Sequence, residues 1–147
     1  MFRLLLACCI LIATFSARAD IIDIDNAELA SLSSSGIPVI DVRTAPEWEE
    51  SGILPGSHLL TYFDARGNAD PAAWLENVKA FAKPGDPVII ICRSGARSQK
   101  VSQFLSQQAG YAKIYNAGNG MLGWIKEGRT VVPAAPAIAS CRKAKTC

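Results

Sequence analysis

The sequence predicts an α/β fold in which a central, five-stranded parallel sheet carries helices on both faces. Short apolar segments alternate with helical segments of about 10 to 15 residues, and this order is typical of parallel sheets. Two of the segments, residues 36–43 and 88–92, contain continuous apolar runs, which indicate strands covered on both sides. In sheets of this kind, ligands bind beyond the carboxyl ends of the strands.

The first strand and the first helix follow each other directly. Residues 19–24 ("ADIIDI") predict a short strand. Asp25 is a suitable cap for the next helix, because Glu28 lies three positions later and can complete a capping box. Leu29 and Leu32 then give this helix an inner face.

The second strand, residues 36–43 ("GIPVIDVR"), leads into a helix that begins at "TAPEWEE". Thr44 is the expected cap, Pro46 stands in the first turn and Glu47 completes a second capping box. Residues 58–62 ("HLLTY") predict the third strand.

The clearest helix follows Asp70 and Pro71 and ends before "KPGDP". Its apolar positions recur at the spacing of one helical face. These positions are Trp74, Leu75, Val78, Phe81 and Ala82.

The fourth strand, residues 88–92 ("VIIIC"), is the most hydrophobic one, and a helix with one apolar side follows it. Residues 112–116 predict a fifth strand and residues 120–128 a last helix. Residues 131–147 are rich in alanine and proline and then basic, so we expect them to form a flexible C-terminal tail.

The N-terminus has the layout of a secretory signal peptide, residues 1–19. Arg3 precedes an apolar run, and Ala17 and Ala19 form an A-x-A site, so cleavage is expected after Ala19. The apolar run of about a dozen residues is short of the roughly 20 that span a membrane, so no stable membrane insertion is expected after cleavage. A lipid-modified Cys8 and an uncleaved anchor are the alternatives.

The chain after the predicted signal peptide, residues 20–147, has little excess charge, and its predicted domain comprises residues 20–130. The whole chain has 15 basic and 13 acidic residues, and Arg3 and Arg18 leave with the signal peptide. This balance argues against a protein that binds nucleic acid or an anionic membrane through bulk charge. Any recognition of an anion must therefore be local.

Three cysteines remain after the signal peptide: Cys92, Cys141 and Cys147. An odd number leaves at least one thiol unpaired within an exported chain. A disulfide between Cys141 and Cys147 would close a small loop and leave Cys92 free. The alternative is that one of the two tail cysteines reacts with Cys92.

The segment "CRSGARS", residues 92–98, joins the fourth strand to the next helix. Gly95 permits a tight curl, in which successive N–H groups and the start of the helix form a concave site for an anion. Such a site, together with Arg93 and Arg97, stabilises a thiolate. The sequence therefore predicts that Cys92 is a nucleophile.

The residues after Cys92 are the predicted substrate site. They are Arg93, Ser94, Gly95, Ala96, Arg97 and Ser98. The forked guanidinium groups suit an oxyanion, although Arg93 can instead face outward. Ser94 and Ser98 either donate to the bound group or cap the helix. No metal site is predicted.

Three charged residues, at the end of the second strand and shortly after it, are expected to support the site: Asp41, Arg43 and Glu47. Asp41 and Arg43 lie at its end, and the expected ion pair is that of Arg43 with Glu47. His58, the one histidine, lies at the start of a strand and is expected to be structural, which disfavours a Cys–His hydrolase. The absence of a C-x-x-C motif likewise disfavours a thioredoxin-like protein.

Three segments, "IDVRTAPEWEESGILPGSH", "VIIICRSGARS" and "YNAGNGMLGW", resemble in order and spacing the signatures of single-domain rhodaneses, which are thiosulfate sulfurtransferases. The resemblance covers about residues 21–128. Two departures are evident: Ile53 stands where the family usually has histidine, and "AGNG" (117–120) replaces a glycine pair. Asn119 tolerates a left-handed backbone nearly as well as that glycine.

The resemblance implies a rhodanese-like fold and a specific reaction. Cys92 would attack the outer sulfur of thiosulfate, expel sulfite and hold a persulfide against the N–H groups of residues 93–98. The sulfur would then pass to cyanide or a thiol, with no cofactor, because the cysteine itself carries it. The exported single-domain form is similar to periplasmic sulfurtransferases of Gram-negative bacteria, so a periplasmic location is expected.

Two other functions fit the same residues. One is a non-catalytic rhodanese-like module that binds a partner or senses anions. The other is a cysteine-dependent phosphatase, but the related dual-specificity phosphatases have five residues between cysteine and arginine. Four residues separate Cys92 from Arg97, and this smaller loop favours sulfur transfer.

Overall fold

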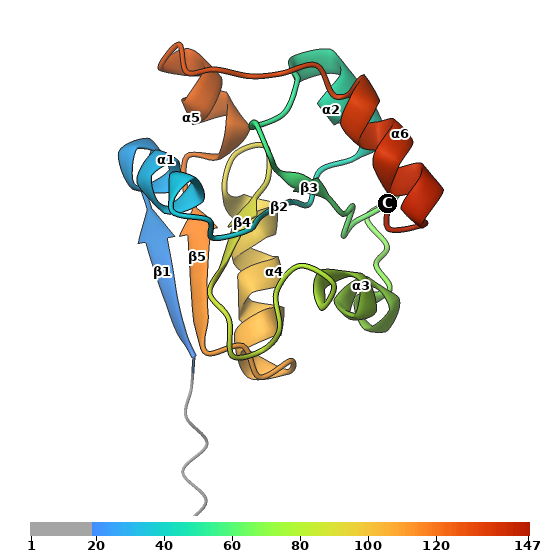
Figure 1. Ribbon diagram of the computed structural model, residues 1–147. Helices are drawn as coiled ribbons and strands as arrows, with labels where there is room; N and C mark the ends of the chain where they lie inside the picture. Colours follow the sequence, from blue (N-terminus) through green and yellow to red (C-terminus); the bar gives the residue numbers. More distant parts are fainter. Residues whose placement is uncertain (1–18) are drawn as a thin grey trace, which may run out of the picture.

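The computed structural model describes residues 19–147, which form one five-stranded sheet and six helices (Figure 1). In spatial order the strands are β1 (Asp20–Ile24), β5 (Lys113–Ala117), β4 (Val88–Ile91), β2 (Val39–Asp41) and β3 (His58–Leu59). The helices are α1 (Asn26–Ser34), α2 (Ala45–Ser51), α3 (Pro71–Val78), α4 (Ala96–Gln107), α5 (Gly120–Lys126) and α6 (Ala135–Ala144). Every strand pair is parallel, so the predicted fold class is confirmed.

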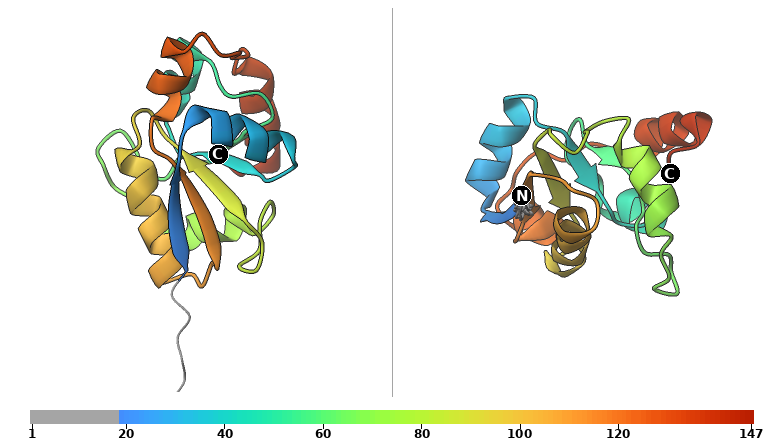
Figure 2. Two further views of the ribbon diagram at one scale, coloured as in Figure 1. Left: turned by 90° about the vertical axis from the view of Figure 1, so that its left-hand side faces the viewer. Right: turned by 90° about the horizontal axis from the view of Figure 1, so that it is seen from below.

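One hydrophobic cluster covers each face of the sheet, and Figure 2 shows α4 and α1 on opposite sides of the strands. The residues of β4 alternate between the two clusters. Val88 and Ile90 pack with α3 and α4, whereas Ile89 and Ile91 pack with α1 and α5. The continuous apolar run of β4 follows from this position, because a strand between two helical layers has no polar side.

The predicted caps Asp25, Thr44 and Asp70 begin three of the helices, and the Thr44 N–H donates to the Glu47 carboxylate (3.0 Å). The side chain of Asp25 accepts a hydrogen bond from the Glu28 N–H (2.8 Å), and the Asp25 N–H donates to the Glu28 carboxylate (3.0 Å). Asp70 caps α3 through its side chain. This helix ends at Val78, earlier than predicted, and the chain continues to the buried Ala82 in hydrogen-bonded turns.

The second and third strands are shorter than the predicted segments, 36–43 and 58–62. Regular pairing in β2 starts only after Pro38, which has no N–H to donate. Beyond β3, single bonds continue the pairing, such as the bond from the Leu60 N–H to the Asp41 carbonyl (3.0 Å).

The prediction that residues 131–147 form a flexible tail is wrong, because most of this segment forms α6. Alanine is the best helix former, and the proline stands in the first turn, where it is tolerated. The helix places Ile138 and Cys141 in a third hydrophobic cluster with Trp48 of α2 and Leu59 of β3. It thus lies beside the outer edge of the sheet (Figure 1).

The predicted signal peptide lies, apart from Ala19, outside the described residues. Within residues 19–147, none of the helices combines the length and the apolar character that a membrane span requires.

Candidate active site

Cys92 follows β4 directly and lies at the carboxyl end of the sheet, with only 1% of its surface exposed. The loop after it is short, because α4 begins at Ala96. The thiol therefore stands between the end of a central strand and the first turn of a helix. This is the edge at which parallel sheets bind ligands.

Two groups contact the sulfur of Cys92. The Gly95 N–H donates to Sγ (3.1 Å), and the Ser98 hydroxyl lies 3.4 Å away. The Ser98 hydroxyl also donates to the Gly95 carbonyl (2.9 Å), which ties the loop to α4. Among the described residues, no other backbone N–H bonds Sγ, and the contact of the outer persulfide sulfur with the N–H groups of residues 93–98 stays a prediction.

Gly95 gives the loop its curl. Its φ of +93° is in the left-handed region, and a Cβ at this position would collide with the carbonyl oxygen of Gly118. Glycine is therefore needed here for two reasons, the backbone conformation and the close approach of a second chain segment.

The first turn of α5 forms the back of the loop, a role that was not predicted. The N–H groups of Met121 and Leu122 donate to the carbonyls of Cys92 and Arg93 (2.9 and 3.0 Å). Gly120 has a φ of +56°, and a Cβ there would lie 2.5 Å from the Arg93 carbonyl oxygen. The glycines of "AGNG" were the sequence signal for this contact.

Asn119 does not use the left-handed backbone that it tolerates. Its φ of −83° is right-handed, and Gly120 takes the left-handed position instead. Ile53, the other departure from the family signature, is buried and pairs with Val132, consistent with a structural role.

Arg97 forms a two-pronged ion pair with Glu47 of α2, with N–O distances of 2.9 and 2.5 Å. The side chains of Arg97 and Glu47 remain 29% and 23% exposed. Hydrogen bonding from Arg97 lowers the pKa of Glu47 to about 2, and the same contact raises the pKa of Arg97. The sequence predicts that Arg97 contacts the substrate, whereas in the structure its guanidinium is paired with the Glu47 carboxylate.

Arg43 pairs with Asp41 and not with Glu47, so the expected Arg43–Glu47 ion pair is wrong. Arg43 and Asp41 are almost completely buried, and their closest N–O distance is 2.7 Å. A buried guanidinium needs a buried carboxylate together with further acceptors, which Ser51 Oγ (2.7 Å) and the Gly52 carbonyl (2.8 Å) supply. Glu47 contributes only its backbone carbonyl (3.3 Å).

The other predicted loop residues lie at the surface. Arg93, Ser94 and Ala96 are exposed, and no side-chain partner of Arg93 or Ser94 occurs within the described part of the chain. Of the two arginines in the loop, Arg93 is therefore the one whose guanidinium is available to an anion from solution.

A cavity of about 300 Å³ lies beside the loop, between α2 and α5. It is lined by Arg43, Glu47, Glu50, Ser51, Arg93, Met121, Leu122 and Ile125. Arg93, the neighbour of Cys92 in the chain, lines the cavity directly, and so does Glu47, which holds Arg97.

His58 has no contact with this loop. Its ring stacks on Phe81 with 3.9 Å between centroids, and burial lowers its pKa. It lines another cavity, of about 360 Å³, beside α6. The described residues contain no group of three potential metal ligands.

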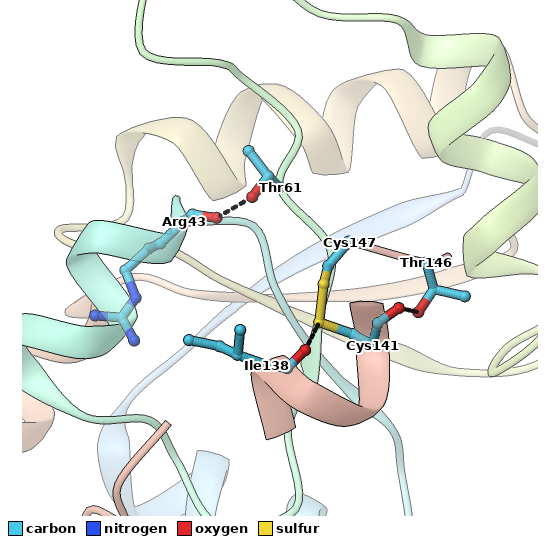
Figure 3. The surroundings of a disulfide bond; sticks show 6 residues. All are labelled: Arg43, Thr61, Ile138, Cys141, Thr146 and Cys147. Carbon is cyan, nitrogen blue, oxygen red and sulfur yellow. Dashed lines mark hydrogen bonds between the residues drawn. A yellow bond between two sulfur atoms is a disulfide. The ribbon is translucent and has the colours of Figure 1, made fainter. Parts of the chain in front are cut away.

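Cys141 and Cys147 form a disulfide at the end of α6, with a Cα–Cα distance of 5.3 Å (Figure 3). The Thr146 hydroxyl donates to the Cys141 carbonyl across the same turn (3.4 Å). Cys92 is the free, buried cysteine of the described chain. The bridge is thus confined to the C-terminal segment.

Comparisons with known proteins agree with this geometry. The model of the Rhodanese-like domain family matches residues 25–127. "Thiosulfate sulfurtransferase 18" of Arabidopsis thaliana is 30% identical over 119 residues, which are 78% of this chain and 85% of that protein.

Solved structures support the same fold. A rhodanese-related protein of Thermoplasma volcanium is 27% identical, with a TM-score of 0.57, and the match covers 76% of this chain and 97% of that one. A human single-domain sulfurtransferase (22% identity, TM-score 0.56) matches over 71% of this chain and 96% of its own. With a free cysteine at the end of β4, the signature loop and a family match over most of its length, this chain belongs to the rhodanese-like domain family.

Proposed function

We propose that the protein is a thiosulfate sulfurtransferase that carries sulfur as a persulfide on Cys92. The observation that carries the proposal is the free, buried thiol at the end of β4, with the Gly95 N–H directed at its sulfur (3.1 Å). A fixed N–H donor beside a sulfur stabilises negative charge on it. The sulfurtransferase homologues support this class of reaction.

The reaction consists of two sulfur transfers. In the first, the Cys92 thiolate attacks the outer sulfur of thiosulfate. A bond forms between Sγ and that sulfur, the sulfur–sulfur bond of thiosulfate breaks, and sulfite leaves with the electron pair. In the second, cyanide or a thiolate attacks the outer sulfur of the persulfide and forms a bond with it. The bond from that sulfur to Sγ breaks, and its electron pair returns to Cys92. No cofactor is required, because the cysteine carries the sulfur between the two steps.

The residues of the loop have different roles in the first transfer. The Gly95 N–H donates to Sγ and stabilises its charge, and the Ser98 hydroxyl, 3.4 Å from Sγ, can turn its proton from the Gly95 carbonyl to the charged sulfur. Arg93, exposed and without a partner among the described residues, attracts the dianionic donor. Arg97, held by Glu47, fixes the wall of the loop. Thiosulfate as the donor is supported by the name of the Arabidopsis relative.

Intact-mass analysis after exposure to thiosulfate tests the proposal. We expect one added sulfur atom on the wild-type protein and none on Cys92→Ser, with sulfite released in equal amount. Cys147→Ser is the matched control, because it removes a cysteine outside the loop and should still accept sulfur. A sulfur adduct on Cys92→Ser, or none on the wild type, would contradict the assignment, and the latter would favour the non-catalytic module.

A further inference from the structure

The cavity between α2 and α5 has an exposed apolar surface that a small dianion such as thiosulfate does not need. Its α5 side carries Leu122 and Ile125, which are 49% and 39% exposed and are two of the four large hydrophobic residues exposed in the described chain. A third, Val131, lies against Gly52, next to the cavity residue Ser51. Three of the four exposed large hydrophobic residues of the described chain thus lie in or next to this cavity.

The charged residues of the same cavity fall into two classes. Arg43 and Glu47 are already occupied by ion pairs with Asp41 and Arg97. Glu50 and Arg93 are exposed and have no ion-pair or hydrogen-bond partner for their side chains within residues 19–147. One negative and one positive charge therefore remain available to a ligand.

The apolar wall is attached to the cysteine loop itself. The Met121 and Leu122 N–H groups bond the carbonyls of Cys92 and Arg93, so the first turn of α5 is fixed next to the reactive residue. A molecule that lies on Leu122 and Ile125 is held beside the loop that contains the persulfide. Cyanide, with two heavy atoms, cannot use this surface.

We propose that this cavity binds the organic part of the sulfur acceptor, and that the acceptor is an amino-acid-like thiol. Such a molecule carries its thiol on a short aliphatic chain and bears both a carboxylate and an ammonium group. Its carboxylate binds Arg93, its ammonium group binds Glu50, and its methylene groups pack on Leu122 and Ile125. The inference rests on the proposed function, since it concerns the second sulfur transfer.

In that transfer, the acceptor loses its thiol proton to solvent and its sulfur attacks the outer sulfur of the persulfide. A bond forms between these two sulfurs, and the bond from Cys92 Sγ to the outer sulfur breaks. The electron pair returns to Sγ, and the acceptor leaves as a persulfide. No other oxidant or reductant takes part.

Four thiols test the inference on protein first loaded with thiosulfate. They are homocysteine (both charges), cysteamine (ammonium only), 3-mercaptopropionate (carboxylate only) and 2-mercaptoethanol (neither). Each thiol is compared with itself across variants, so differences in intrinsic reactivity cancel. The measured quantity is kcat/KM for sulfur transfer relative to wild type.

Glu50→Gln should lower kcat/KM about threefold to fivefold for homocysteine and cysteamine and should leave the other two thiols unchanged. Leu122→Ser should lower it about fivefold for homocysteine. Glu49→Gln and Ile22→Ser are the matched controls, because both residues are exposed and lie outside the cavity lining.

Equal losses of kcat/KM in Glu50→Gln for thiols with and without an ammonium group would overturn the inference. A loss in Glu49→Gln as large as in Glu50→Gln, or in Ile22→Ser as large as in Leu122→Ser, would overturn it too. A site for a protein thiol would leave all four small thiols insensitive to both variants, which would also overturn it. Failure to load sulfur from thiosulfate contradicts the proposed function instead, so the two failures are distinguishable.

Discussion

The ion pair between Glu47 and Arg97 yields a prediction with a defined pH range. Glu47→Gln keeps the shape of the side chain but removes its charge. The fall of the Glu47 pKa from 4.5 to about 2 corresponds to at most about 3 kcal/mol of stabilisation. Because both side chains are about a quarter exposed, solvent screening reduces this to about 1 kcal/mol.

The pH dependence of this stabilisation follows from the direction in which folding shifts the pKa of Glu47. A carboxyl group whose pKa is lowered by folding stabilises the protein above the unfolded value of 4.5, and this contribution is lost as the pH falls through about 2. Wild type should therefore be about 1 kcal/mol more stable than Glu47→Gln at pH 7, or about 3 °C higher in Tm. The difference should decrease between pH 4.5 and pH 2.

Urea unfolding at several pH values measures this difference. Glu49→Gln is the control, because Glu49 is exposed and its side chain has no partner within residues 19–147. Equal stability of wild type and Glu47→Gln at pH 7 would refute the energetic argument. A difference that persists undiminished at pH 2 would show that packing, and not charge, is responsible.

Three further predictions concern the loop and the tail. Gly95→Ala should lower the free energy of unfolding by at least about 2 kcal/mol more than Gly36→Ala does, since both glycines have a positive φ but only Gly95 faces another chain segment. Equal losses of stability would contradict the collision of the added Cβ with the Gly118 carbonyl. Ser98→Ala should slow the burst of sulfite about tenfold, because the hydroxyl 3.4 Å from the sulfur is lost; an unchanged burst would remove Ser98 from the site. Reducing the Cys141–Cys147 disulfide should lower stability by about 2 kcal/mol, the closure entropy of its short loop, and a Tm independent of reductant would contradict this.

The sheet and the reactive loop were predictable because their signals are local. The apolar run of β4 identifies a strand covered on both sides, and glycine followed by helix-compatible residues marks the turn after Cys92. Capping residues such as Asp25 and Asp70 fixed two helix starts for the same reason. Each of these features depends on residues within a few positions of one another.

The ion pairs and the C-terminal helix were not predictable in this way. Glu47 and Arg97 are 50 positions apart, and the sequence alone does not show that Arg43 prefers the buried Asp41. The helix α6 is stabilised by contacts with α2 and β3. Its alanine- and proline-rich composition suggested a tail, because the partner surface is distant in the sequence.

The helix α6 lies outside the span matched by the family model, residues 25–127, yet it completes the fold. It covers β3, an edge strand whose outer side would otherwise be open to pairing with another molecule. A protein shortened to the family boundary would also uncover Trp48, now 1% exposed. Expressing the chain through α6 keeps this apolar surface covered, whereas the span matched by the family model alone would leave it open.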